Sequence, residues 1–166
     1  MKEQKLPSIR QIALLVLMES FENNRKLNEV LMEQQMIYQY LPKQDRAFLN
    51  RLCRGCVERT GQIDYVINSV SKTKVKKMKP VIRTIIRMGA YQILFMEVPD
   101  SAACNEAVKL AKGKGFHGLT GFVNGVLRNI ARSKHEISYP GKKDFLYYLE
   151  SVYSIPEWLG RFFVSM

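Results

Sequence analysis

Apolar residues recur at intervals of three and four along almost the whole chain, the spacing of helices that bury one face. The first such segment follows Ser8, a residue type that caps helices, and another follows Pro80. About seven such segments are separated by short connections, and Gly61 is expected to end the third. One or two shorter segments follow Pro140, and no stretch alternates with the period of a strand. We predict an all-α bundle of about seven helices with one or two short C-terminal helices.

The 166 residues are enough for one well-buried core. We place that domain at residues 1–138 and a tail at residues 139–166. No apolar run approaches the roughly 20 residues that span a bilayer, so no membrane association through a spanning helix is expected. Three cysteines are an odd number, and a chain with this much core does not need disulfides, so a reducing cytoplasm is expected.

The net charge of +11 is concentrated in two stretches that contain no acidic residue. They hold half of the 26 basic residues, and the remainder of the chain is close to neutral. Such concentrations are typical of polyanion sites, so nucleic acid and an anionic membrane surface both fit, as does a solvated face without a ligand. The stretch between Asp64 and Glu97 contains Lys72, Lys74, Lys76, Lys77, Lys79, Arg83 and Arg87, and the stretch between Glu106 and Glu136 contains Lys109, Lys112, Lys114, Arg128, Arg132 and Lys134.

Two short motifs suggest redox or cofactor chemistry but fit other roles better. Cys53 and Cys56 form a CxxC, yet both lie on the apolar stripe of the third segment, where cysteine behaves as a small core residue. The spacing GxGxxG at residues 113–118 follows a helical segment instead of the strand that a dinucleotide site requires. The lysines beside it, and the start of a helix after it, fit an RNA phosphate better. No set of residues resembles a catalytic or metal site, so the chain alone is not expected to be an enzyme or to hold a cofactor.

A polar stripe runs along the seventh segment. Asn124, Arg128 and Arg132 recur every fourth residue and share one helix face. Asparagine can bind base edges and arginine can grip phosphates or stack on bases, and the alternative is an exposed polar face without a ligand. Gly125 is expected to allow another helix to approach closely.

Several blocks of the sequence resemble the NusB-like RNA-binding fold. The resemblance covers roughly residues 8–134. Its blocks are Ile9-Arg10 with Ala13, Asp45-Arg46 with Leu52, Gly55, Val57 and Arg59, and the segments 87–94 (RMGAYQIL), 105–112 (NEAVKLAK) and 122–128 (FVNGVLR).

Two positions and the tail distinguish branches of that family. Stand-alone NusB factors usually have Glu where Gln92 stands and Asp where Arg128 stands. The sequence is more similar to the N-terminal domain of bacterial small-subunit rRNA cytosine-5 methyltransferases of the RsmB (Sun) type, and residues 153–159 resemble the linker toward their catalytic domain. The resemblance implies that a methyltransferase domain using S-adenosylmethionine lies outside this chain.

The implied function is docking on small-subunit rRNA, with its own methyltransferase domain as a further partner. One alternative is a stand-alone transcription antitermination factor that binds leader RNA with a ribosomal protein. Another is a protein-interaction module whose basic faces meet an acidic partner. For the rRNA function, Arg10, Arg87, Asn124 and Arg128 are expected to make the more specific contacts. The expected phosphate contacts are Lys72, Lys74, Lys76, Lys77, Lys79, Arg83, Lys112, Lys114 and Arg132.

Overall fold

The computed structural model describes residues 5–166 and confirms the all-α prediction. Every regular element in this range is helical. The elements are α1 (Ile9–Glu22), α2 (Leu27–Ile37), α3 (Lys43–Glu58), α4 (Thr60–Val70), the 3₁₀ turn η1 (Val75–Lys77), α5 (Pro80–Phe95), α6 (Asp100–Gly113), the 3₁₀ turn η2 (His117–Leu119), α7 (Thr120–Ser133), α8 (Phe145–Tyr153) and α9 (Glu157–Ser165). None of the described helices is both long and apolar enough to cross a membrane.

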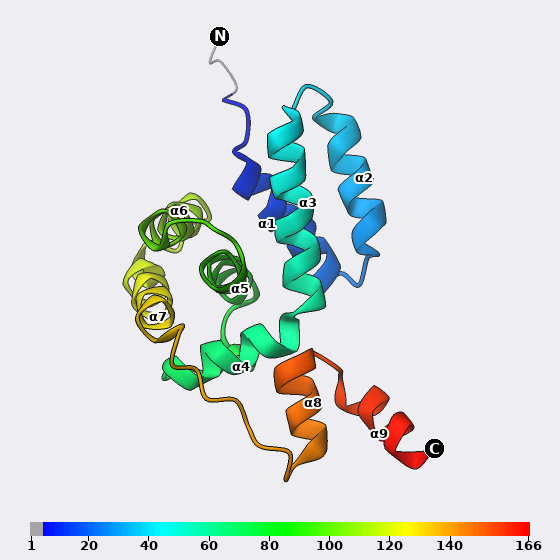
Figure 1. The fold of residues 1–166 in the computed structure, drawn as a ribbon. Helices are drawn as coiled ribbons and strands as arrows, with labels where there is room; N and C mark the ends of the chain where they lie inside the picture. Colours follow the sequence, from blue (N-terminus) through cyan, green and yellow to red (C-terminus); the bar gives the residue numbers. More distant parts are fainter. Residues whose placement is uncertain (1–4) are drawn as a thin grey trace.

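Helix α5 lies at the centre of the bundle (Figure 1). It is apolar on nearly every side, and its buried residues include Ile82, Ile85, Ile86 and Ile93. Helices α1 and α3 pack on one side of it and α6 and α7 on the other, while α4 crosses below (Figure 1). A helix that is apolar on nearly every side must be covered almost all round, and this requirement gives the bundle its centre.

Local capping explains where the helices begin. Ser8 forms the N-cap of α1, and its hydroxyl accepts a hydrogen bond from the Gln11 N–H while the Gln11 side chain accepts one from the Ser8 N–H. Pro80 stands in the first turn of α5, where proline costs no helical hydrogen bond. Both helix starts were predicted from the sequence.

Close helix packing occurs at Gly55 and Gly89 instead of at Gly125. A Cβ atom at Gly89 would lie 2.6 Å from Leu127 Cδ1, so this glycine is what lets α7 approach α5. Gly125 is exposed and no atom of another element lies within 4 Å of its Cβ position. The prediction for Gly125 was wrong, because this residue is on the solvent side of α7.

Gly61 also has a role that differs from the expected helix break. Helix α3 ends at Glu58, and Gly61 lies inside α4. A Cβ atom there would lie 2.6 Å from the Glu150 carbonyl oxygen of α8, so a side chain would separate the two helices. The Ser154 hydroxyl accepts a hydrogen bond of 3.0 Å from the Gln62 N–H. The glycine therefore allows α8, in the tail, to pack against the body of the bundle.

Candidate nucleic-acid interface

The first basic stretch surrounds η1, between α4 and α5. Val75 and Met78 are buried, and the Val75 N–H donates a hydrogen bond of 2.9 Å to Asn68 Oδ1. These two apolar anchors hold the backbone against the bundle, so the lysines between and beside them point to solvent. Lys72, Lys74, Lys76, Lys77 and Lys79 are all exposed.

The second basic stretch turns at the end of α6. Gly115 has a φ of +84°, which side chains rarely adopt, and the Phe116 N–H donates to the Ala111 carbonyl at 2.9 Å. Together with the bond from the Gly115 N–H to the Lys112 carbonyl, this is a Schellman motif that ends the helix. The GxGxxG spacing thus belongs to a helix C-terminus, and the turn leaves Lys112 and Lys114 exposed.

The two stretches meet at this turn. Lys79, in front of α5, lies over the partly buried ring of Phe116, with 5.4 Å between its Nζ and the ring centroid. The lysines around η1 and the two lysines at the end of α6 therefore belong to neighbouring parts of one surface, which the sequence spacing alone did not establish.

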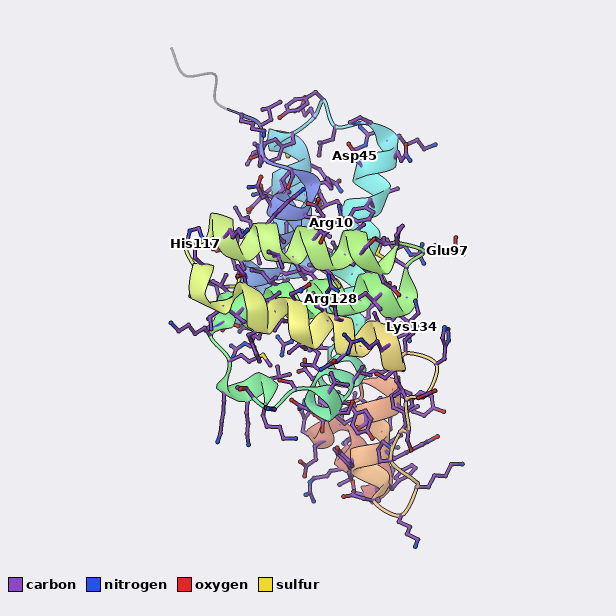
Figure 2. All side chains as sticks on the ribbon, turned by 90° about the vertical axis from the view of Figure 1, so that its left-hand side faces the viewer. Arg10, Asp45, Glu97, His117, Arg128 and Lys134 are labelled. Atoms are coloured by element: carbon purple, nitrogen blue, oxygen red, sulfur yellow. The ribbon has the colours of Figure 1, made fainter. Side chains whose placement is uncertain are left out.

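Helices α6 and α7 lie side by side on this face of the molecule (Figure 2). Arg128 is on the exposed side of α7, and its Nε donates a hydrogen bond of 3.2 Å to Asn124 Oδ1. Arg128 and Arg132 border a shallow depression against the start of α6, at Ser101. The predicted stripe is thus a surface feature beside a groove between two helices.

The two carboxylates of α6 are paired with lysines of the second basic stretch. Asp100 lies 2.9 Å from Lys134 Nζ, and Glu106 lies 3.0 Å from Lys109 Nζ. Within the described residues, no carboxylate pairs with Arg128 or Arg132. The same holds for Lys112 and Lys114, so the face carries excess positive charge that can attract a polyanion.

The three other predicted arginines are held by internal partners. Arg83 pairs with Glu22 at 2.5 Å, and both Nε and Nη2 of Arg87 lie 2.8 Å from the two carboxylate oxygens of Asp64.

Arg10 has no carboxylate but an amide as its partner. Its Nε donates to Gln92 Oε1 at 2.8 Å, and its guanidinium lies 5.0 Å from the centroid of the Phe48 ring. Burial lowers the pKa of Arg10, while Glu106 acts in the opposite direction. The structure thus separates these three arginines from the exposed cations, although they remain predicted contacts until RNA binding is measured.

The CxxC cysteines lie in the core, as the sequence predicted. Cys53 and Cys56 are fully buried, and the Cys53 thiol faces the Ala13 carbonyl at 3.9 Å. Burial raises the pKa of Cys53 to about 12, so its thiol stays protonated near neutral pH. Among the described residues, no three His, Cys, Asp or Glu side chains are grouped so that they could hold a metal ion.

A cavity of about 510 Å³ was not anticipated from the sequence. It lies between α4, η1, α5 and α8, and Tyr65, Lys76 and Tyr147 are among its lining residues. Because α8 follows α4 by more than 70 residues, no local pattern could have indicated that they meet.

The sequence model of the NusB family matches residues 7–132, which span α1 to nearly the end of α7. The chain belongs to the NusB family. The resemblance found in the sequence blocks is thus confirmed.

Among the relatives of this NusB-family chain are longer proteins with methyltransferase names. The chain is 35% identical over 158 residues to the probable ribosomal RNA small subunit methyltransferase B of Bacillus subtilis, and 32% identical to the Synechocystis protein of the same name. These matches cover 95% and 94% of this chain but 35% of each relative. The chain therefore spans about a third of their length, and the Bacillus match extends beyond residue 132 into the tail.

Solved structures share the NusB-family fold. NusB of T. maritima is 26% identical with a TM-score of 0.67, and the match covers 81% of this chain and all of that one. A chain from the crystal structure of the antitermination factors NusB and NusE in complex with dsRNA has a TM-score of 0.68 at 22% identity, covering 75% and 94% of the two chains. At that identity, the second match supports the fold alone.

Proposed function

We propose that this NusB-family domain binds small-subunit rRNA and docks it for a cytosine-5 methyltransferase domain outside residues 1–166. The main support is the surface at which the two acid-free stretches meet, because several of its exposed cations pair with no carboxylate of the described residues. These cations are Lys79, Lys112, Lys114, Arg128 and Arg132. Phosphates would take the place of those missing partners and release counterions, which makes such binding strongly dependent on salt.

The relatives support the choice of RNA and of the attached activity. Two of them carry the name of a small-subunit rRNA methyltransferase, and their similarity continues into the tail. In this proposal residues 139–166 begin the connection to the catalytic domain, and S-adenosylmethionine binds in that domain. The protein would act in the cytoplasm, where rRNA is modified.

Fluorescence anisotropy with labelled fragments of small-subunit rRNA tests the proposal. We expect affinity to fall steeply between low and moderate salt. The double variant Arg128→Glu/Arg132→Glu is expected to bind at least about tenfold more weakly, since each charge-assisted contact contributes roughly 1.5–3 kcal/mol.

The matched control is Lys26→Glu/Lys43→Glu, which reverses two exposed cations outside the acid-free stretches. Both lie at helix starts, where an acidic residue is compatible with the helix dipole, so the fold is retained. The control should lose much less affinity. Salt-independent binding, or equal losses in the two double variants, would exclude this surface.

A transcription antitermination factor is the second candidate, because NusB of T. maritima matches along its full length. Adding NusE distinguishes the two functions. A strong NusE-dependent gain in affinity for a leader RNA, without a gain for rRNA, would favour antitermination. Failure to bind either RNA at low salt would favour a protein-interaction module.

A further inference from the structure

The cavity between α4, η1, α5 and α8 has the size of a small-ligand site. Lys74 and Lys76 of the first basic stretch are among its lining residues. One of its walls comes from α8 in the tail, and Gly61 lets that wall stand close to α4. The cavity therefore exists only when the tail is packed on the bundle.

Two of its cations are available to a ligand. Lys74 and Lys76 line the cavity, are exposed, and pair with no carboxylate of the described residues. Arg83 and Arg87 also line it but are held by Glu22 and Asp64. The two arginines thus give the wall a fixed shape, while the two lysines can bind a phosphate.

Two aromatic rings, those of Tyr65 and Tyr147, line the same cavity as these lysines. Tyr147 is 47% exposed, so part of its ring is open to a stacking partner. It meets Tyr65 edge-on at 6.0 Å, and Tyr65 is itself stacked on Tyr139 at 5.4 Å. The Tyr65 hydroxyl donates to the Ser138 carbonyl at 2.6 Å. These contacts position Tyr147 as the outermost ring of an ordered group.

The remaining polar groups suit the edge of a base. The Asn68 side-chain oxygen accepts from the Val75 N–H, which leaves its NH₂ group able to donate. The carboxylate of Glu150 is exposed and pairs with no cation of the described residues, so it can accept from an amino group. Such amide and carboxylate groups read base edges in nucleic-acid complexes.

We propose that this cavity binds one unpaired nucleotide of the RNA, with its base on Tyr147 and its phosphate at Lys74 and Lys76. The inference rests on the proposed rRNA-binding function and adds a preference for unpaired residues to it. Single-stranded recognition combines aromatic stacking with cationic phosphate contacts, and both are present here. A duplex has its bases stacked internally, so it engages the basic surface without filling the cavity.

The test compares an RNA hairpin with an unpaired loop against a blunt duplex that has the same stem sequence. We expect Tyr147→Leu to weaken hairpin binding at least about fivefold, since stacking on an aromatic side chain is worth about 1–3 kcal/mol per base. Its affinity for the duplex should remain that of the wild type. Tyr40→Leu, which removes another exposed tyrosine far from the cavity, should change neither affinity.

Two neighbouring lysines give a second comparison that does not depend on α8 packing. Lys76 and Lys77 are both exposed on η1, but only Lys76 lines the cavity. Lys76→Gln is expected to weaken hairpin binding about tenfold more than Lys77→Gln, while the two variants should bind the duplex equally. Equal hairpin affinities for this pair would overturn the cavity as a nucleotide site.

Photocrosslinking identifies the occupant. A hairpin with 5-bromouridine in its loop should crosslink to peptides of α4 or α8. Excess cytidine monophosphate is then added. If it removes the crosslink while the anisotropy of the bound hairpin stays unchanged, the cavity binds a free nucleotide, and the proposal that it binds a nucleotide of the RNA strand is overturned. If the wild type and all the variants bound the hairpin and the duplex equally, the cavity would be refuted as a nucleotide site but the proposed rRNA-binding function would stand. If the wild type bound neither RNA, the proposed function would be refuted as well.

Discussion

Replacing Arg10 by methionine tests whether this arginine stabilises the fold, and the same replacement at the exposed Arg128 provides the comparison. The Arg10 guanidinium is the partner of Gln92 Oε1, and the Gln92 side chain is 2% exposed. Methionine keeps the apolar stem but leaves that oxygen without a donor, because the Gln92 NH₂ group is itself bound to the Met88 carbonyl. Water cannot readily replace the lost donor at a site so deeply buried.

The expected destabilisation follows from these contacts. An unsatisfied buried polar group costs about 1–3 kcal/mol, and the contact with the Phe48 ring adds about 0.5–1 kcal/mol. Part of this loss is offset, because the methionine variant no longer has to bury the charged guanidinium. We expect Arg10→Met to lower the free energy of unfolding by about 2–3 kcal/mol, which shifts the melting temperature of a domain of this size by roughly 4–12 °C. Arg128→Met, at an exposed position, should stay within about 0.5 kcal/mol of the wild type.

Thermal unfolding and RNA anisotropy on the same variants provide the assay. Arg10→Met should bind rRNA normally below its melting temperature, whereas Arg128→Met should be stable but bind weakly. The double variant Arg10→Met/Gln92→Leu should recover most of the stability, since removing both partners leaves no orphaned group. An Arg10→Met protein with normal stability and reduced RNA affinity would refute the structural role and restore Arg10 as an RNA contact.

Three further predictions concern packing, capping and ionisation. Gly55→Ala should destabilise the fold by about 2 kcal/mol, because the new Cβ would lie 1.9 Å from Tyr91 Cζ and the overpacking outweighs the gain in helix propensity. Gly125→Ala should stabilise the fold by about 0.5–1 kcal/mol, because its Cβ position is open and only the gain in helix propensity remains. Chemical denaturation of both variants measures this contrast, and a stable Gly55→Ala protein would contradict it. Ser8→Ala should cost about 1 kcal/mol in the same assay through loss of the capping box, and an unchanged midpoint would show that the cap is dispensable. Burial raises the pKa of Cys53 to about 12 from the ordinary 9.0, so above pH 9 the unfolded protein loses the thiol proton that the folded protein keeps. The free energy of unfolding should therefore fall as the pH rises from about 9 toward 12. A Cys53→Ala protein with the same pH dependence would contradict this cause.

Most of the secondary structure could be predicted because its causes are local. The apolar spacing, the Ser8 cap and Pro80 act within a few residues, and each helix start that they predicted is present. The core position of Cys53 follows from the same periodicity. The glycines were harder to interpret, since a glycine that breaks a helix and one that admits a neighbour look alike in sequence.

The candidate site was predicted less completely than the fold. The acid-free stretches were evident, but their members differ in availability. Arg83 and Arg87 lie at ideal i, i+4 spacing for a shared face, yet their carboxylate partners are 61 and 23 residues away in sequence. The cavity at α8 had no sequence signal, because its lysines lie at η1 while its tyrosines lie in α4 and α8.

The amino-acid sequence determines that this chain is helical, where its helices begin and that its positive charge is concentrated, since periodicity, capping and charge are properties of neighbouring residues. Tertiary packing decides which cations remain available. It brings the two basic stretches together at Lys79 and Phe116, and it lets Arg10 donate a hydrogen bond to Gln92, 82 residues away. Whether a charge faces solvent or a partner depends on which distant segments meet, and only the folded bundle determines that.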